Sequence, residues 1–522
     1  MQGFGLIEKT PKKMFRKRLD AYADIEIFEG FPFNHYIVSE TGLSPKEKTI
    51  AGALIQLASR KSSFGDLETA LGKNSSLVED IRRKIVQPID AEEMILRFPS
   101  TESAASIKNS LFEIAKKFGS ENPELFSQEV TDETIGFKKL SPLMRDPNLE
   151  EIMVNGFNRT VFVFHRKFGF CRTNIVAKET GFLKDLIERI ASSANKQLTE
   201  QHPLLDARLP DGSRANATLE YVTPLGHSLT IRKFNQVPLS ISDIVANKTV
   251  SSEVAAFLWL MVEGMNIEPK NIIITGGTGS GKTTLLNVLG FFIRAHERIV
   301  SIEDTLEIDL AGRENWIQME SRPKLRDIAE VTMDDLLKNS LRMRPDRLLV
   351  GEVRDEAAQT LFVAMDTGHD GILGTLHSNS AREMLLRLKS PPMSVPEQML
   401  PLLDFVVVMQ RNYNDKTGVT RSIKQIAEVS RMDDKVLLAN VFELNDKTGL
   451  LERTDIPSHV FETLAQKSGI SKNELKRELL VRQKIIDWLQ IQKIHSNKEV
   501  SEIIQMYYYD PEAILKKVSG SL

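Results

Sequence analysis

Residues 271–284 contain the pattern that most restricts how this chain can fold. The apolar segment Asn271–Thr275 is followed by residues with helical spacing, and between them lie Gly276, Gly277, Thr278, Gly279, Ser280, Gly281, Lys282, Thr283 and Thr284. Glycines spaced in this way before a Lys-Thr pair are typical of a phosphate-binding loop that joins a strand to a helix. Such glycines let backbone N–H groups converge on phosphate oxygens, and the helix dipole adds to the attraction. The pattern therefore predicts a nucleotide site.

The loop also predicts which ligands are bound. Lys282 is expected to contact the β- and γ-phosphates, and the Thr283 hydroxyl is expected to bind Mg²⁺, so ATP and Mg²⁺ are the predicted ligands. The alternative is a glycine-rich turn without a ligand. The strand before the loop, the Lys-Thr pair and the helix after it together argue against that alternative.

Strands and helices alternate between about residues 250 and 455. The expected strands are Asn271–Thr275, Arg298–Glu303, Ile317–Glu320, Arg347–Val353, Gly371–Leu376 and Asp404–Met409, and the expected helices are Lys282–Ile293, Met333–Met343, Glu356–Thr367 and Ala381–Leu388. This alternation predicts an α/β domain with a mainly parallel, helix-covered sheet.

Hydrolysis of a bound nucleotide requires a group that orients water near the γ-phosphate. Two predicted strands end in the carboxylates Glu303 and Glu352, and parallel sheets bind ligands at these strand ends. Either carboxylate could orient water while the other helps to hold Mg²⁺. We expect Glu352 to orient the attacking water molecule, and Glu352 is also a candidate Mg²⁺ ligand beside Thr283. Gly351 stands where an aspartate usually precedes such a glutamate, and His377 could sense the γ-phosphate or be structural.

The rest of the chain carries no chemical motif of this kind. We expect a helical N-terminal region with a basic arm (residues 1–135), an α+β domain (136–234), a linker (235–249), the nucleotide domain (250–455) and a helical C-terminal region (456–522). The basic residues of the first 20 positions predict either a solvated terminus or an arm that touches anionic lipid or an acidic partner.

Charge and composition exclude several classes of protein. The net charge of −3, from 68 basic and 71 acidic residues, argues against a general nucleic-acid coat. The one cysteine, Cys171, excludes an intramolecular disulfide framework and a multi-cysteine zinc site. The longest apolar run, Val254–Val262, has nine residues, far fewer than the roughly 20 that span a bilayer. We therefore expect an intracellular protein without a spanning segment or signal peptide.

Four ordered segments resemble the type II/type IV secretion ATPase superfamily. They are Gly276–Thr283, Ile302–Ile308, Arg344–Asp355 and Gly374–Asn379, which correspond to that family's Walker A loop, Asp box, atypical Walker B strand and His box. Pro142–Gly156 and Leu205–Arg214 also resemble the family's sensor-like N-terminal domain. The resemblance covers about residues 138–430, and in this family the missing Walker B aspartate is usual.

The resemblance implies a RecA-like P-loop domain preceded by the sensor-like α+β domain. It also implies that Arg208, Arg214 and Arg232 of the sensor-like domain close over the nucleotide. The expected assembly is a cytoplasmic, hexameric ring at the inner face of the cell membrane. It would act on a polytopic membrane platform protein with accessory motor proteins, and an anionic membrane surface is a further possible partner.

Two features narrow the resemblance to archaeal members, which drive archaella or type IV pili. One cysteine cannot form the four-cysteine zinc module that bacterial type II members usually carry, and the helical N-terminal segment and the long helical tail with Tyr507–Glu512 are similar to archaeal members. The expected function is ATP-driven assembly or rotation of such a filament, or protein secretion. The alternatives are a nucleic-acid translocase and a slow nucleotide-gated scaffold. The near-neutral charge disfavours the translocase, so no nucleic acid is expected as a partner.

Overall fold

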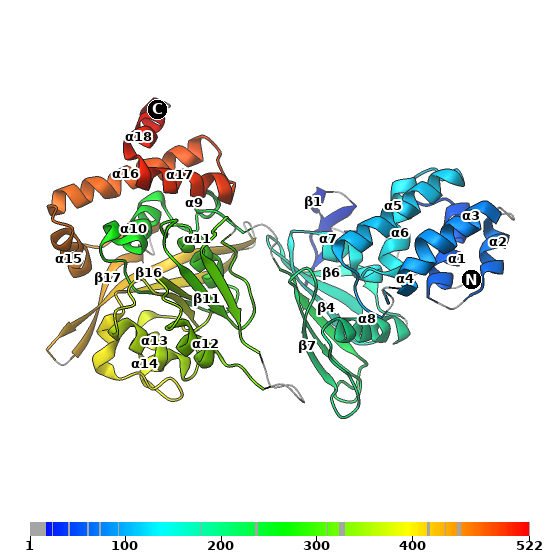
Figure 1. Ribbon diagram of the computed structural model, residues 1–522, viewed down its shortest axis with the longest axis horizontal. Coiled ribbons are helices and arrows are strands. Elements are labelled where there is room, and N and C mark those ends of the chain that lie inside the picture. The colour runs from blue at the N-terminus through cyan, green and yellow to red at the C-terminus, as the bar shows by residue number, and fades with distance from the viewer. Residues whose placement is uncertain are drawn as a thin grey trace. The chain divides into compact units, whose positions relative to one another are not determined.

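The computed structural model describes residues 17–520 apart from residues 23, 40–41, 60–61, 72–74, 92, 95, 179, 235–237, 311, 323–328, 415–417, 434 and 446–449. Most of the predicted basic arm, residues 1–16, lies outside the described residues. The chain forms two compact units, Met1–Asn235 and Gln236–Leu522 (Figure 1). Each unit is built on its own sheet, with nine strands among the described residues.

The sheet of the second unit has the strand order β12-β11-β13-β14-β10-β15-β16-β17-β18. The strands from β12 to β15 in this order are parallel: β10 (Ile272–Gly276), β11 (Ile299–Glu303), β12 (Trp316–Glu320), β13 (Arg347–Val350), β14 (Leu373–Leu376) and β15 (Phe405–Asn414). The helices between them are α11 (Lys282–Gly290), α12 (Met333–Ser340), α13 (Ala357–Asp366) and α14 (Ala381–Lys389). The predicted α/β class with a mainly parallel sheet is confirmed.

The same sheet continues beyond the predicted strands as an antiparallel meander. Its strands are β15, which pairs with β10 on its other side, then β16 (Gly418–Met432), β17 (Lys435–Asn445) and β18 (Leu450–Arg453), each hydrogen-bonded to the strand before it. Strands β16, β17 and β18 were not among the strands predicted from the sequence. Their pairing extends the sheet past β10 and brings β16 next to the strand that borders the phosphate-binding loop.

The longest apolar run forms a buried helix of the second unit. It lies in α10 (Ser252–Glu263), where every residue from Val254 to Val262 is at most 1% exposed. The helix starts with a Ser251 cap and ends at Gly264, which has a φ of +63° and leaves no room for a side chain beside Pro269. No helix in the described part of the chain is both long and apolar enough to cross a bilayer.

Helices follow the meander to the end of the chain. They are α15 (His459–Lys467), α16 (Lys472–Ile491), α17 (Asn497–Tyr509) and α18 (Pro511–Gly520), with short helical segments earlier in the unit at α9 (Ile241–Ala246), η4 (Gly264–Asn266) and η5 (Glu397–Leu402). The apolar residues of α9 and of the C-terminal helices belong to the same core as α10 and α11, whereas those of η5 belong to the core on β13 and α13. The stretch expected to be a linker, residues 235–249, contains α9. Gln490 Nε2 of α16 donates a hydrogen bond to Ser242 Oγ of α9 at 2.8 Å.

The first unit has a mainly antiparallel sheet with the order β1-β2-β3-β6-β5-β4-β9-β8-β7. The strands are β1 (Arg18–Tyr22), β2 (Ile25–Phe28), β3 (Asn34–Val38), β4 (Leu149–Asn155), β5 (Thr160–His165), β6 (Gly169–Val176), β7 (Leu204–Arg208), β8 (Arg214–Thr218) and β9 (Ser228–Arg232). The helices α8 (Thr180–Ser193) and α7 (Ser141–Arg145), with η3 (Lys138–Leu140) before α7, share its apolar core.

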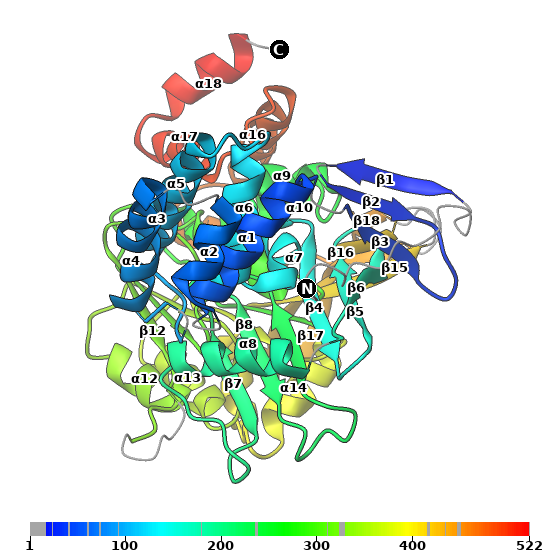
Figure 2. The same ribbon diagram turned by 90° about the vertical axis from the view of Figure 1, so that its right-hand side faces the viewer.

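Strands β1 to β3, drawn in blue in Figure 2, correct the expectation that the N-terminal region is helical throughout. Their buried residues alternate, as in Ile25 and Ile27 of β2, which is the period of a strand with one buried face. The hydroxyls of Tyr22 and Tyr36 both donate to Asp146 Oδ2, at 2.8 and 2.6 Å. These bonds attach the first strands to the sheet-bearing domain.

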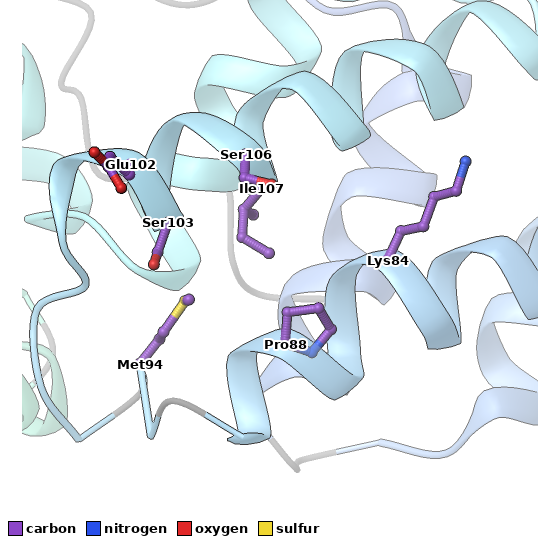
Figure 3. A pocket seen from close by; sticks show the side chains of 7 residues that line it. All are labelled: Lys84, Pro88, Met94, Glu102, Ser103, Ser106 and Ile107. Carbon is purple, nitrogen blue, oxygen red and sulfur yellow. The ribbon is translucent and has the colours of Figure 1, made fainter.

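Residues 45–134 form the predicted helical part with a core of its own. Its helices are α1 (Pro45–Ala58), α2 (Phe64–Leu71), α3 (Ser75–Ile81), η2 (Arg82–Val86), α4 (Gln87–Ala91), α5 (Thr101–Lys117) and α6 (Pro123–Thr134). An open pocket in this part is lined by Lys84, Pro88, Met94, Glu102, Ser103, Ser106 and Ile107 (Figure 3). None of the predicted site residues lies in it.

Candidate nucleotide site

The phosphate-binding loop connects the central strand β10 to the start of α11 at Lys282. Gly279 has a φ of +69°, a backbone conformation that favours glycine, and a Cβ there would lie 2.9 Å from Arg411 Nη1, so the arginine would have to shift. Lys282 is 8% exposed, and its Nζ donates to Gly277 O at 3.1 Å. Its ammonium group thus lies over the loop, where a phosphate-binding lysine has to be.

His377 lies beside the Lys282 ammonium, and the charge of Lys282 also acts on Glu352. His377 follows β14, the strand beside β10, and its Nε2 is 3.4 Å from Lys282 Nζ. Burial and the charge of Lys282 lower the pKa of His377, which favours a neutral imidazole. Burial opposes ionisation of Glu352, but a hydrogen bond from Arg354 and the positive charges nearby hold its pKa below the usual value. Glu352 is therefore a carboxylate at neutral pH.

Glu303 has a different environment from Glu352. It is 1% exposed, and its Oε2 accepts hydrogen bonds from the backbone N–H groups of Glu307 (2.7 Å) and Ile308 (2.9 Å). Its other oxygen, Oε1, is buried and has no hydrogen-bond partner among the described residues. Burial raises the pKa of Glu303 to about 7. This carboxyl can take up or release a proton near neutral pH.

Glu303 also explains why position 351 is a glycine. Gly351 follows β13, and its N–H donates to Ile302 O of the neighbouring strand β11 at 2.8 Å. A Cβ on Gly351 would lie 2.8 Å from Glu303 Cγ, so an aspartate would collide with the Glu303 side chain. The space of the missing aspartate is filled by a carboxylate from the adjacent strand.

The raised pKa of Glu303 predicts a pH-dependent effect of Glu303→Gln on stability. Between about pH 4.5 and pH 7 the folded chain keeps a proton on Glu303 that the unfolded chain releases. The contribution of Glu303 to the free energy of unfolding of the wild type therefore decreases as the pH rises through this range. The free energy of unfolding of Glu303→Gln, relative to wild type, should increase by on the order of 3 kcal/mol from pH 4 to pH 8. Urea unfolding at several pH values measures this difference.

Glu352→Gln is the matched control for that experiment. The pKa of Glu352 is lowered, so its ionised form contributes stability at neutral pH that is lost as the pH falls. Glu352→Gln should therefore lose stability relative to wild type as the pH rises through the acid range. The same pH trend in both variants would contradict the environments described above.

Two arginines that the sequence analysis did not identify lie against the loop. Arg411 of β15 and Arg421 of β16 are directly opposite each other in the antiparallel pair. Arg421 Nε donates to Gly279 O at 2.8 Å, and the guanidinium group of Arg411 lies beside the same glycine. No local motif marks either residue, because only the β15–β16 pairing brings them to the loop.

The three predicted arginines of the first unit come together in one row. Arg208 of β7 is opposite Arg214 of β8, and Arg214 is opposite Arg232 of β9, with Glu151 of β4 next in the row. Directly opposite residues project from the same face, where like charges destabilise a sheet. Arg214 Nε is also buried without a hydrogen-bond partner among the described residues. Such a row is suited to binding an anion.

Comparisons with known proteins agree with the ordered motifs. Residues 135–483 match the family described as type II/IV secretion system protein. The uncharacterized protein MJ0781 of Methanocaldococcus jannaschii is 31% identical over 72% of this chain and 76% of its own length. The conjugal transfer protein TrbB of Rhizobium radiobacter is 30% identical over 56% of this chain and 87% of its own length.

Solved structures are similar at lower identity. The VirB11 ATPase of the Brucella suis type IV secretion system is 24% identical, with a TM-score of 0.29, over 55% of this chain and 92% of that protein. The family match alone extends from the sensor-like domain through the phosphate-binding loop and into the C-terminal helices. The resemblance that the motifs indicated is confirmed, and the chain belongs to the type II/IV secretion system protein family.

Proposed function

We propose that this protein hydrolyses ATP with Mg²⁺ and uses the reaction to drive a membrane-bound machine that builds or moves a filament or exports protein. The observation that carries the proposal is the phosphate-binding loop with Lys282, His377 and the carboxylate of Glu352 around it. Lys282 would neutralise charge on the β- and γ-phosphates, and the N–H groups at the start of α11 would bind phosphate oxygens.

The two carboxylates are suited to different tasks. A general base works best with a pKa near the working pH, and the Glu303 carboxyl has a pKa of about 7. Its buried Oε1 without a partner among the described residues can accept a hydrogen bond from a water molecule. Glu352 is ionised and lies near Lys282, so it suits Mg²⁺, together with the Thr283 hydroxyl. Mg²⁺, when bound, supplies further neutralisation of phosphate charge. These environments favour Glu303, rather than Glu352, as the group that orients water.

Substitution of each glutamate separates the two roles. Glu303→Gln should lower kcat by about 10²–10⁴-fold with nearly unchanged ATP affinity, and the loss of rate on acidification below about pH 7 should disappear. Glu352→Gln should instead raise the Mg²⁺ concentration needed for half-maximal rate. Phosphate release measured against pH and Mg²⁺, with ATP binding by calorimetry, gives both quantities. A large loss of kcat in Glu352→Gln, with a changed Mg²⁺ requirement in Glu303→Gln, would mean that Glu352 orients the water molecule.

The assembly and its cellular partner are further parts of the proposal. The family match supports a ring of six identical subunits at the inner face of the membrane, acting with a membrane platform protein. The relatives from Methanocaldococcus jannaschii and the helical C-terminal tail favour an archaeal-type filament, either an archaellum or a type IV pilus. Deleting the gene and inspecting cells for filaments by electron microscopy tests this, because a secretion or conjugation role would leave filaments intact.

A further inference from the structure

The C-terminal end of α11 is held by side chains that lie far away in the sequence. Helix α11 begins at Lys282, and the backbone carbonyls that follow its last turn belong to Phe291, Phe292 and Ile293. The N–H groups of these three residues form the last backbone bonds to the helix, at Val288, Leu289 and Gly290, and their own carbonyls then require donors from elsewhere. Here most of the donors come from α17, more than 200 residues later in the chain.

Two α17 residues provide these donors. The Tyr508 hydroxyl donates to Phe292 O at 2.7 Å, and Gln505 Nε2 donates to Ile293 O at 2.9 Å and, less closely, to Phe291 O at 3.4 Å. Arg313 adds a bond from Nη2 to Phe291 O at 3.1 Å. All three carbonyls at this end are therefore occupied, and α17 contributes to each of them.

The Tyr508 hydroxyl is itself held in place. It accepts a hydrogen bond from Trp259 Nε1 of α10 at 2.5 Å, so it cannot turn away without leaving the indole N–H unsatisfied. The Trp259 ring stacks on the Phe292 ring with centroids 5.4 Å apart, and the Arg294 guanidinium lies 4.5 Å from the centre of the Tyr508 ring. The end of α11 is thus packed and hydrogen-bonded from the same side.

We propose that Gln505 and Tyr508 are positioning residues for the phosphate-binding loop. Helix α11 has nine residues and is about 13 Å long, so it moves as one rigid piece. Its first turn carries Lys282 and the N–H groups that face the phosphates, whereas α17 binds the three carbonyls that directly follow its last turn. The C-terminal helices therefore set the position of the loop from the opposite end of α11. This inference rests on the proposed binding of ATP at the loop.

Two neighbouring tyrosines give a matched test. Tyr508→Phe removes the hydroxyl that binds α11, whereas Tyr507→Phe removes a hydroxyl that donates to Glu478 Oε1 of α16 at 2.8 Å. Both rings contact Trp259, and both changes delete one oxygen from the same helix. A general weakening of the C-terminal helices would affect both variants alike, but a positioning role affects Tyr508→Phe alone.

The readouts are the dissociation constants of Mg²⁺-ATP and Mg²⁺-ADP, measured by calorimetry on the full chain, with the melting temperature of each variant. Tyr508→Phe should weaken nucleotide binding by roughly 3–10-fold, and Tyr507→Phe should change it by less than about twofold. Hydrogen exchange at residues 277–284 should become faster in Tyr508→Phe only. Equal affinities in the two variants, whether both lowered or both unchanged, would overturn the inference.

Gln505→Leu keeps the test decisive if Tyr508→Phe does not fold. This change removes the amide donor to Ile293 O while keeping a side chain of similar size, and it should also weaken nucleotide binding several-fold. Unchanged affinity in a folded Gln505→Leu would overturn the inference. Failure of the wild-type chain to bind Mg²⁺-ATP would instead overturn the proposed function, so the two failures are distinguishable.

Discussion

Replacing Lys282 with alanine should lower the rate of ATP hydrolysis by about 10³-fold, which is the size of effect expected when one fixed donor to the reacting phosphate is lost. The side chain is buried, and its ammonium lies 3.4 Å from His377 Nε2 and 3.1 Å from the Gly277 carbonyl, so the alanine variant lacks the positive charge at the loop. Steady-state phosphate release at saturating Mg²⁺-ATP measures the loss.

An exposed lysine of the same unit provides the control for this experiment. Lys389 belongs to α14 and forms an ion pair with Glu397 at 2.9 Å, away from the loop motif. Lys389→Ala should hydrolyse ATP at nearly the wild-type rate, because a surface ion pair contributes little. Normal turnover by Lys282→Ala would contradict the assignment of the phosphate-binding loop.

Replacing Arg214 with alanine should lower kcat by about 10³-fold or more while ATP still binds through the loop. A guanidinium that reaches the γ-phosphate during transfer raises the rate by roughly 10³–10⁵-fold. Arg214 is in the centre of the row with Arg208 and Arg232, and its Nε has no hydrogen-bond partner among the described residues, so it is the best candidate for this role. The turnover number and the ATP dissociation constant together measure the effect.

Arg172→Ala is the matched control, since Arg172 is an exposed arginine on β6 of the same sheet that donates to Thr160 Oγ1. Mixing Lys282→Ala with Arg214→Ala then shows which subunit supplies the arginine. Partial recovery of activity would mean that the row serves the nucleotide of a neighbouring subunit. Inactivity without recovery would place the arginine and the nucleotide in one subunit. Full activity of Arg208→Ala, Arg214→Ala and Arg232→Ala would contradict any role in catalysis.

The strand pairings of the meander and of the N-terminal strands in the first unit were not predicted from the sequence. Strands β1 to β3 precede a region with clear helical spacing, and they join their sheet by pairing β3 with β6, more than 130 residues later. Strands β15 to β18 are joined in part by the turn-prone sequence Asn-Asp-Lys-Thr-Gly, which occurs at residues 414–418 and again at 445–449, but these hairpins were not predicted from it. The pairing of β3 with β6 instead depends on a distant partner, whereas helical spacing and end caps are local.

The sequence by itself determined the phosphate-binding loop, the six parallel strands and the family, because each depends on a short run of residues whose spacing is visible locally. Glycines at 276 to 281 and the Lys-Thr pair identify the loop wherever the chain folds. The strand ends also placed Glu303 and Glu352 at the correct edge of the sheet, since parallel strands share that edge.

Only the tertiary structure distinguished the two carboxylates and found the residues that support the loop. The high pKa of Glu303 and the low pKa of Glu352 depend on burial and on Arg354, which are properties of the packed site. Arg421 and Tyr508 reach the loop and α11 across 142 and 216 residues of sequence. Contacts of this length leave no periodic or local trace in the chain, because they form only when separate elements pack against one another.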